Sequence, residues 1–126
     1  MYEKTFPNKR FKHTLAFLQK HISPSEAILD LGVDNPFSKI MKENGYTVTN
    51  TKGEDLDIDQ RALAEGNYPV TTAFEIFEHL LNPFTVLQNI QSDKLVISIP
   101  MRLWFSPAYR SKTCLLYTSD AADEGL

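Results

Sequence analysis

Three apolar runs of the chain are each followed by polar residues whose types suit ligand binding. Asp30 and Gly32 end the first run, polar residues 50–57 follow the second, and residues 75–79 follow the third. A carboxylate such as Asp30 suits an ammonium or sulfonium group better than a phosphate. Gly32 allows a close approach of the backbone to a ligand, and the N-terminus of the helix behind it would offer free amide hydrogens. The Asp30–Gly32 turn is therefore typical of a nucleotide-binding loop.

Glu75 and His79 are four residues apart, so a helical segment would place both side chains on one face. His79 is the candidate general base, because an imidazole can take a proton from a reacting group. A histidine that only makes structural hydrogen bonds is the alternative interpretation. Asp55 and Asp57 likewise either bind a ligand or belong to a solvated edge, and Asp30 either binds a ligand or caps a helix.

These loops need regular elements to hold them together, and the hydrophobic periodicity predicts such elements. Phe11, Leu15, Leu18 and Ile22 recur at the spacing of an amphipathic helix. Pro36 suits the first position of a further helix, which is expected to stop at Asn44–Gly45. The predicted helices cover residues 8–21, 36–44, 60–65 and the stretch from 83 onward, and the predicted strands cover residues 27–32, 46–50, 55–58, 70–74 and 94–99.

The last of these helices begins with Asn82 as its cap and Pro83 at its first position. Its residues Phe84, Leu87 and Ile90 are predicted to face the core. Alternation of helices and strands indicates right-handed crossovers and a parallel sheet covered on both faces. The predicted fold class is α/β, a Rossmann-like three-layer sandwich with a mostly parallel sheet. Ligands of such sheets bind at the carboxyl ends of the strands, where the strand order reverses.

Two segments resemble class I S-adenosylmethionine-dependent methyltransferases. The stretch Ile28-Leu29-Asp30-Leu31-Gly32 looks like the motif I strand and loop of that family. The stretch Phe74-Glu75-Ile76-Phe77-Glu78-His79-Leu80-Leu81-Asn82-Pro83 is similar to the segment after the fourth strand in the branch that acts on small molecules. The resemblance spans roughly residues 27–102. It implies S-adenosyl-L-methionine as cofactor, a small-molecule acceptor and methyl transfer as the reaction.

The resemblance also implies roles for individual residues. Asp30 would face the amino acid portion of the cofactor, and Gly32 would leave room for the ligand; Glu75 is a further candidate cofactor contact. An acid or amide after the second strand would hold the ribose hydroxyls, and since the usual position falls at about Thr51 or Lys52, Asn50 or Glu54 could take that role. Either Asp55 or Asp57 would bind the adenine amino group. The loop departs from the family pattern at Asp34 and Pro36, where glycines are usual, and Asp34 is retained as a candidate cofactor contact. No metal ligands are expected.

Residues 114–126 are expected to be foreign to the domain. The run from Cys114 to Glu124 matches a translation of DNA that resembles a transposase-based sequencing-library adapter. Residues 1–113 would then be a partial methyltransferase domain that is truncated after its fifth strand. We expect the outer edge of that strand to be unpaired, and such edges invite aggregation.

The expected tail changes the bulk composition. The chain has a formal net charge of −3 from 16 acidic and 13 basic residues, and three of the acids but none of the bases lie in residues 114–126. The remaining chain is therefore neutral, which gives no support to a nucleic-acid partner. The only cysteine, Cys114, also lies in the tail, so a disulfide or a zinc site is not expected.

The expected location is the cytoplasm. No apolar run approaches the ~20 residues of a membrane span, and the first residues lack the apolar core of a secretory signal. Two other functions remain open. A dinucleotide-dependent oxidoreductase would need G-x-G-x-x-G after the first strand, where this chain has Gly32 followed by Val33-Asp34-Asn35-Pro36. A degenerate, non-catalytic Rossmann-like interaction domain is the other alternative, favoured by the missing motif I glycines and opposed by Asp30 and the segment Glu75–His79.

Overall fold

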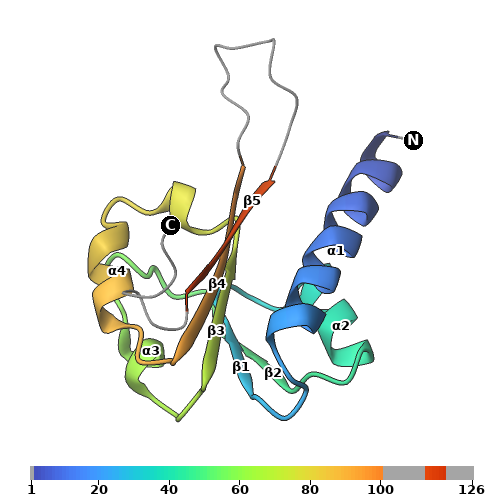
Figure 1. The fold of residues 1–126 in the computed structure, drawn as a ribbon. Helices are drawn as coiled ribbons and strands as arrows, with labels where there is room; N and C mark the ends of the chain where they lie inside the picture. Colours follow the sequence, from blue (N-terminus) through green and yellow to red (C-terminus); the bar gives the residue numbers. More distant parts are fainter. Residues whose placement is uncertain (1, 101–112, 119–126) are drawn as a thin grey trace.

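The computed structural model describes residues 2–100 and 113–118, with side chains from residue 9 to residue 100. Helices and strands alternate along most of the chain, as Figure 1 shows. In chain order the elements are α1 (Tyr2–His21), β1 (Ile28–Asp30), α2 (Pro36–Glu43), β2 (Val48–Asn50), α3 (Arg61–Ala64), β3 (Val70–Phe74), the 3₁₀ helix η1 (Phe77–His79), α4 (Pro83–Asn89), β4 (Lys94–Pro100) and β5 (Thr113–Thr118).

The strands form one sheet in the order β2-β1-β3-β4-β5. The first four strands are parallel, and β5 runs antiparallel to β4. The predicted α/β class with a mostly parallel sheet is confirmed. Because β2 lies on one side of β1 and β3 on the other, the strand order reverses at β1. The carboxyl end of β1 is therefore the position where such a sheet opens a crevice for a ligand.

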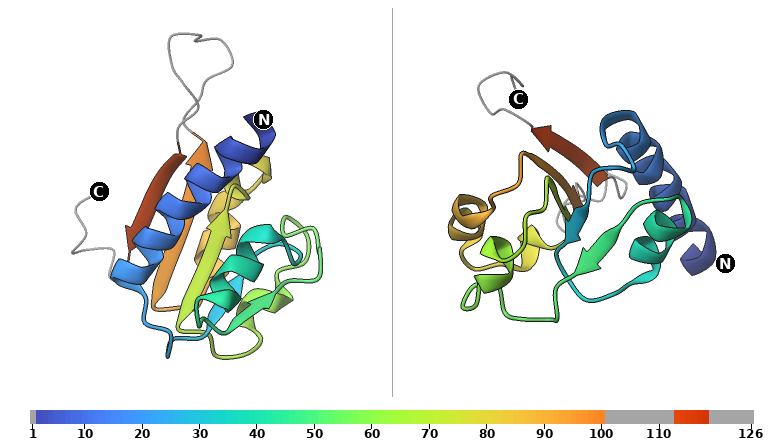
Figure 2. Two further views of the ribbon diagram at one scale, coloured as in Figure 1. Left: turned by 90° about the vertical axis from the view of Figure 1, so that its right-hand side faces the viewer. Right: turned by 90° about the horizontal axis from the view of Figure 1, so that it is seen from below.

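Helices cover both faces of the sheet, as Figures 1 and 2 show. On one face α1 and α2 pack over a core that includes Leu18, Ile28, Met41 and Val96. On the other face α3, η1 and α4 cover a second core, whose buried residues are Leu29, Leu31, Leu56, Leu63, Ala73, Phe77, Val86, Leu95 and Ile97. Burial of both faces explains why the parallel strands are nearly continuous apolar runs rather than alternating ones.

α1 buries the apolar stripe that the sequence predicted. Leu18 and Ile22 of this stripe are fully buried, while Phe11 and Leu15 pack against the same core at partial exposure. α1 begins at Tyr2, earlier than the predicted start at residue 8. Its end at His21 agrees with the prediction, because the following Ser-Pro pair cannot continue a helix.

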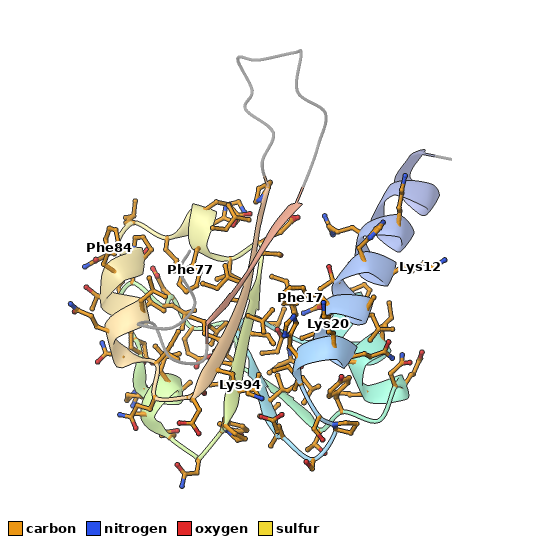
Figure 3. The ribbon with its side chains drawn as sticks, in the orientation of Figure 1. Lys12, Phe17, Lys20, Phe77, Phe84 and Lys94 are labelled. Atoms are coloured by element: carbon orange, nitrogen blue, oxygen red, sulfur yellow. The ribbon has the colours of Figure 1, made fainter. Side chains whose placement is uncertain are left out.

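Two predictions for residues 55–90 differ from the structure. Residues 55–58 form a turn instead of a minimal strand, and the turn is closed by the amide of Ile58 donating to the carbonyl of Asp55 at 2.9 Å. Of the three residues predicted to face the core from this helix, only Ile90 packs against it. Phe84 is 74% exposed and Leu87 is 36% exposed, and the fully buried residue of α4 is Val86. Figure 3 shows Phe84 on the outer side of α4 and Phe77 on the side of the sheet. A helix of seven residues presents little more than one inward position per turn.

The outer edge of β4 is paired, contrary to the expected open edge. β5 lies antiparallel along it, from Leu95 opposite Thr118 to Pro100 opposite Thr113. All but the first residue of β5 belong to the stretch expected to be foreign. An edge strand pairs through backbone groups, so β4 can accept any extended segment that lacks proline. The division of the chain at residue 113 stays a prediction, and residues 119–126 lie outside the described part.

The longest helix, α1, is too polar to cross a membrane. It contains 20 residues, but several are charged, and none of the helices in the described part of the chain has the apolar stretch that a membrane crossing requires.

Candidate ligand-binding site

A row of three polar side chains crosses the sheet at its carboxyl edge. In the register of the parallel strands Asp30 lies opposite Asn50 of β2 and opposite Thr72 of β3. The hydroxyl of Thr72 donates to Oδ1 of Asp30 at 2.7 Å, and Nδ2 of Asn50 donates to Oδ2 at 2.9 Å. Nδ2 of Asn35 contacts Oδ2 at 3.4 Å from the loop before α2. Three donors from three segments thus hold one carboxylate.

Asp30 is only 2% exposed, so its charge is costly to bury. Removal from water raises the pKa of the Asp30 carboxyl to about 6, against the opposing effect of the hydrogen bonds from Thr72, Asn35 and Asn50. Its three partners are all neutral groups, and no cation lies within ion-pair distance of it among the described residues. A cation brought by a ligand would supply the missing countercharge.

The N-terminus of α2 is closed by Asn35. Its Oδ1 accepts the amides of Phe37 and Ser38, both at 3.0 Å, and the Ser38 hydroxyl accepts the amide of Asn35 at 2.9 Å in return. Pro36, the first helical residue, has no amide hydrogen. The expectation of free amide hydrogens at this helix is therefore wrong. Asn35, not Asp30, is the helix cap, so the carboxylate of Asp30 is left for another purpose.

Gly32 leaves the strand with a backbone that other residues rarely adopt. Its φ is +114°, and a Cβ at this position would lie 3.4 Å from Cδ1 of Ile76. The Gly32 amide donates to the hydroxyl of Thr51 at 2.7 Å, which ties the loop after β1 to the end of β2. The glycine is thus required by the turn itself, and the turn brings the backbone to the edge of the cavity.

A cavity of about 340 Å³ opens at the carboxyl ends of β1 and β3. This volume lies at the lower end of the range of roughly 300–1,000 Å³ typical of small-molecule sites. Its walls come from α1, the loop after β1, the start of α2, and the ends of β3 and β4. The charged and polar side chains in the lining are Arg10, Thr14, Asp30, Asn35, Glu75 and Ser98, and aromatic rings of Phe11, Phe37 and Phe74 contribute apolar surface.

Glu75 adopts a left-handed backbone with φ of 59°, which no other non-glycine residue of the described chain shares. Its amide still donates to the carbonyl of Ser98 at 2.9 Å, so the ladder between β3 and β4 continues to this residue before the chain turns. Such a backbone costs about 1–3 kcal/mol and persists at functional sites where the surroundings impose it. Its carboxylate meets Arg10 of α1, with Nη1 and Oε1 3.0 Å apart.

His79 lies outside the cavity lining. Its side chain is 78% exposed, and its Nε2 is 3.8 Å from Oε2 of Glu78. The left-handed Glu75 precedes η1, so Glu75 and His79 do not share a helical face as their spacing suggested. The geometry therefore gives His79 no position from which it could act on a ligand in this cavity.

The three other predicted acids also lie away from the cavity lining. Asp34 is exposed and accepts from the Ser38 hydroxyl at 2.8 Å, which lowers the pKa of its carboxyl. The carboxylate of Asp55 accepts the amide of Asp57 at 3.0 Å within its own turn. Asp57 accepts the amides of Leu81 and Asn82 at 2.9 and 2.8 Å. Asp57 thus fastens the loop before α4 to the loop after β2, which is a structural role.

Asn50 supports the site through its side-chain amide. Its Nδ2 donates to Oδ2 of Asp30 at 2.9 Å and to the carbonyl of Gly32 at 3.2 Å. Its Oδ1 is buried and has no hydrogen-bond partner among the described residues. Buried acceptors normally have partners, because an unmade hydrogen bond costs about 1–3 kcal/mol. Asn50 is not among the residues that line the cavity, so this oxygen lies behind the site.

Sequence reasoning missed Arg10, Asn35 and Thr72 as site residues. Arg10 lies outside the apolar stripe by which its helix was predicted, and that stripe gives no sign of a site. Thr72 lies inside an apolar strand, and only the register that places it opposite Asp30 reveals its role. Asn35 stands immediately before Pro36, and an asparagine before a helix-initiating proline is a recognisable cap signal.

No family model, curated protein or solved structure matches the chain. Within the described residues no group of three His, Cys, Asp or Glu side chains could hold a metal ion. The chemistry of the site therefore follows from its own side chains. They form a small cavity with two carboxylates, one guanidinium and aromatic walls, at the point where the strand order reverses.

Proposed function

We propose that the intact protein is a cytoplasmic, S-adenosylmethionine-dependent methyltransferase with a Rossmann-like fold and a small-molecule acceptor. One observation carries the proposal: the buried Asp30 carboxylate at the cavity has only neutral partners among the described residues, at the switch point of the sheet. A buried charge without a countercharge is expensive to maintain. A cationic ligand would supply the countercharge that Asp30 does not receive from the described residues.

The cavity fits the amino acid portion of the cofactor. Asp30 and Glu75 supply negative charge toward an ammonium or a sulfonium, and Gly32 keeps the loop free of a side chain. Phe11, Phe37 and Phe74 add apolar surface to the same cavity, and a ligand that fills it would displace water. Exclusion of water strengthens each charged contact within the cavity.

Bound S-adenosylmethionine would supply a methyl group that its own sulfonium has already activated. The protein then has to align the donor and the acceptor, and alignment can contribute much of the rate enhancement. Asp30 would orient the amino group, held in turn by Thr72 and Asn50. Ser98 of β4, whose carbonyl accepts the amide of Glu75 at 2.9 Å, also lines the cavity. No general base is assigned within the described residues, in keeping with the exposed position of His79.

The remaining candidate contacts concern the ribose and the adenine of the cofactor. Asn50 does not line the cavity and its Oδ1 is buried, so we propose for it only the role of holding Asp30. The adenine role is not supported for Asp57, because two backbone amides already occupy its carboxylate oxygens. Asp55 stays a candidate at the exposed turn after β2.

The geometry disfavours a dinucleotide-dependent oxidoreductase. In that class the pyrophosphate binds free amides at the N-terminus of the first crossover helix. Here the Asn35 side chain already occupies the amides of Phe37 and Ser38. The nearby Asp30 would also repel a phosphate.

A non-catalytic interaction domain is the second candidate, and one observation favours it. Three large apolar side chains on the α4 side of the molecule are strongly exposed: Ile58 at 84%, Leu81 at 93% and Phe84 at 74%. Exposed apolar side chains that gather on one side commonly mark protein contacts.

Calorimetric titration of the chain with S-adenosylmethionine tests the first candidate. We expect saturable binding by the parent chain and none by the Asp30→Asn variant, which keeps the shape but removes the charge. Asp34→Asn is the matched control, because Asp34 is an exposed carboxylate outside the cavity. Circular dichroism of each sample verifies the fold. A folded parent chain that releases no heat of binding and shows no shift in melting temperature with the ligand would refute the proposal.

A further inference from the structure

Among the described residues that line the cavity, Arg10 is the one with a positive charge, and it comes from a helix outside the sheet. The other charged lining residues, Asp30 and Glu75, follow the ends of strands β1 and β3. In Figure 1 the amino-terminal half of α1 rises beside the carboxyl ends of the strands. α1 is thus part of the site as well as part of the core, because Arg10, Phe11 and Thr14 all line the cavity.

The contact between Arg10 and Glu75 uses little of the guanidinium. Only Nη1 donates to Oε1, at 3.0 Å, and the two side chains are 30% and 27% exposed. A guanidinium carries five N–H donors in a planar fork that matches a carboxylate in bidentate fashion. The single contact holds Arg10 at the cavity while the other edge of the fork can receive a second carboxylate.

The charges of the lining are complementary to one kind of head group. The cavity lining contains the carboxylates of Asp30 and Glu75, and α1 contributes the guanidinium of Arg10. A ligand with an ammonium and a carboxylate on the same carbon atom can satisfy both signs at once. A simple amine would leave Arg10 without a ligand contact, and a simple acid would be repelled by Asp30.

We propose that Arg10 is a specificity-determining residue that recognises the α-carboxylate of the ligand, so that the cavity selects α-amino-acid head groups over amines. Glu75 positions Arg10 through the contact between its Oε1 and Nη1 of Arg10. The inference rests on the proposed function for the identity of the larger ligand, but the head-group preference can be measured separately.

The first experiment compares two probes by calorimetry on the full chain. S-adenosyl-L-methionine carries the α-carboxylate, and its decarboxylated derivative lacks only that group. We expect the parent chain to prefer the carboxylated probe by about 10- to 100-fold, the factor that one charge-assisted hydrogen bond gives. Arg10→Met should bind both probes equally, with the affinity of the parent chain for the decarboxylated one. Arg10→Lys should keep part of the preference.

Lys9→Met is the matched control. Lys9 is an exposed neighbour of Arg10 on α1 and lies outside the cavity lining, so the substitution removes one positive charge without changing the cavity. It should retain the full preference. Equal affinity of the parent chain for both probes would overturn the role of Arg10 while leaving the proposed function intact. An unchanged preference in a folded Arg10→Met variant would overturn it as well.

A second pair of probes covers the case in which neither nucleoside binds, which would refute the proposed function. L-methionine and 3-(methylthio)propylamine differ by the same carboxylate and need no adenosine site. Preference for L-methionine that is lost in Arg10→Met would support the inference independently of methyl transfer. Absence of binding by all four compounds would reject both proposals.

Discussion

Replacing Asp30 by asparagine should stabilise the protein at neutral pH. Asparagine has nearly the same shape, its Oδ1 can accept from Asn50 and Asn35, and its amide can donate to the hydroxyl of Thr72. The contacts of the parent side chain are retained. The variant loses only the charge that burial disfavours, and we expect this loss to abolish ligand binding at the same time.

The magnitude follows from the pKa shift of Asp30. Its carboxyl pKa rises from 3.8 to about 6 on folding, and each pKa unit corresponds to about 1.4 kcal/mol. The folded state therefore binds this proton more tightly than the unfolded state. The contribution of Asp30 to stability falls as pH rises from about 4 to 6 and stays low above that range. Asparagine does not titrate, so the variant should be more stable by about 3 kcal/mol at pH 7.5 and by about 0.5 kcal/mol at pH 4.

Urea denaturation followed by circular dichroism at both pH values measures this difference. Subtraction of the parent curve from the variant curve at each pH removes the titration of all other groups. The exposed Asp34 is the control: its carboxyl pKa is lowered, so Asp34→Asn should lose a little stability at pH 7.5 instead of gaining it. A destabilised Asp30→Asn variant at pH 7.5, or a difference that does not change with pH, would refute the reasoning.

Three further predictions concern the fold. Asn35→Ala removes the cap of α2 and should lower the free energy of unfolding by about 1 kcal/mol, measured by urea denaturation; an unchanged midpoint would argue against the cap. Leu18→Ala in the core should cost about 2–5 kcal/mol, whereas Phe84→Ala on the exposed side of α4 should change stability by less than about 0.5 kcal/mol; equal losses in thermal melts would contradict the assigned faces. Asp57→Ala should release the loop before α4 and speed amide hydrogen exchange there, and unaltered protection would oppose its structural role.

Local pattern was sufficient for most of the elements. The stripe from Phe11 to Ile22 and the strand at residues 70–74 lie where periodicity placed them. Both signals depend only on which residues can be buried together at a given repeat. The minimal strand at 55–58 failed because Asp55 accepts the amide of Asp57 within the segment, and such local bonds compete with pairing in a sheet. The inward face of α4 failed because a helix of two turns has too few apolar positions for periodicity to choose between faces.

The candidate site was predicted in part. Asp30, Gly32 and Glu75 line the cavity as expected, because they follow strands whose carboxyl ends meet at one edge of the sheet. Asp34, Asp55 and Asp57 were cofactor candidates through the family resemblance. Their carboxylates accept from other protein groups instead: Asp34 and Asp55 from donors within four residues, and Asp57 from the amides of the loop before α4. An acid in a loop has such donors within reach, and the sequence does not say which partner it finds.

By itself the sequence determined the order of helices and strands, the parallel α/β class, and the edge of the sheet at which polar residues would gather. These features depend on burial patterns and on proline and glycine, which act over a few residues. The tertiary structure alone decided that Thr72 and Asn50 hold Asp30, that Arg10 reaches Glu75 across 65 residues of chain, and that β5 covers the edge of β4. Contacts of this kind depend on strand register and on where α1 packs, and both are set by burial of the whole core.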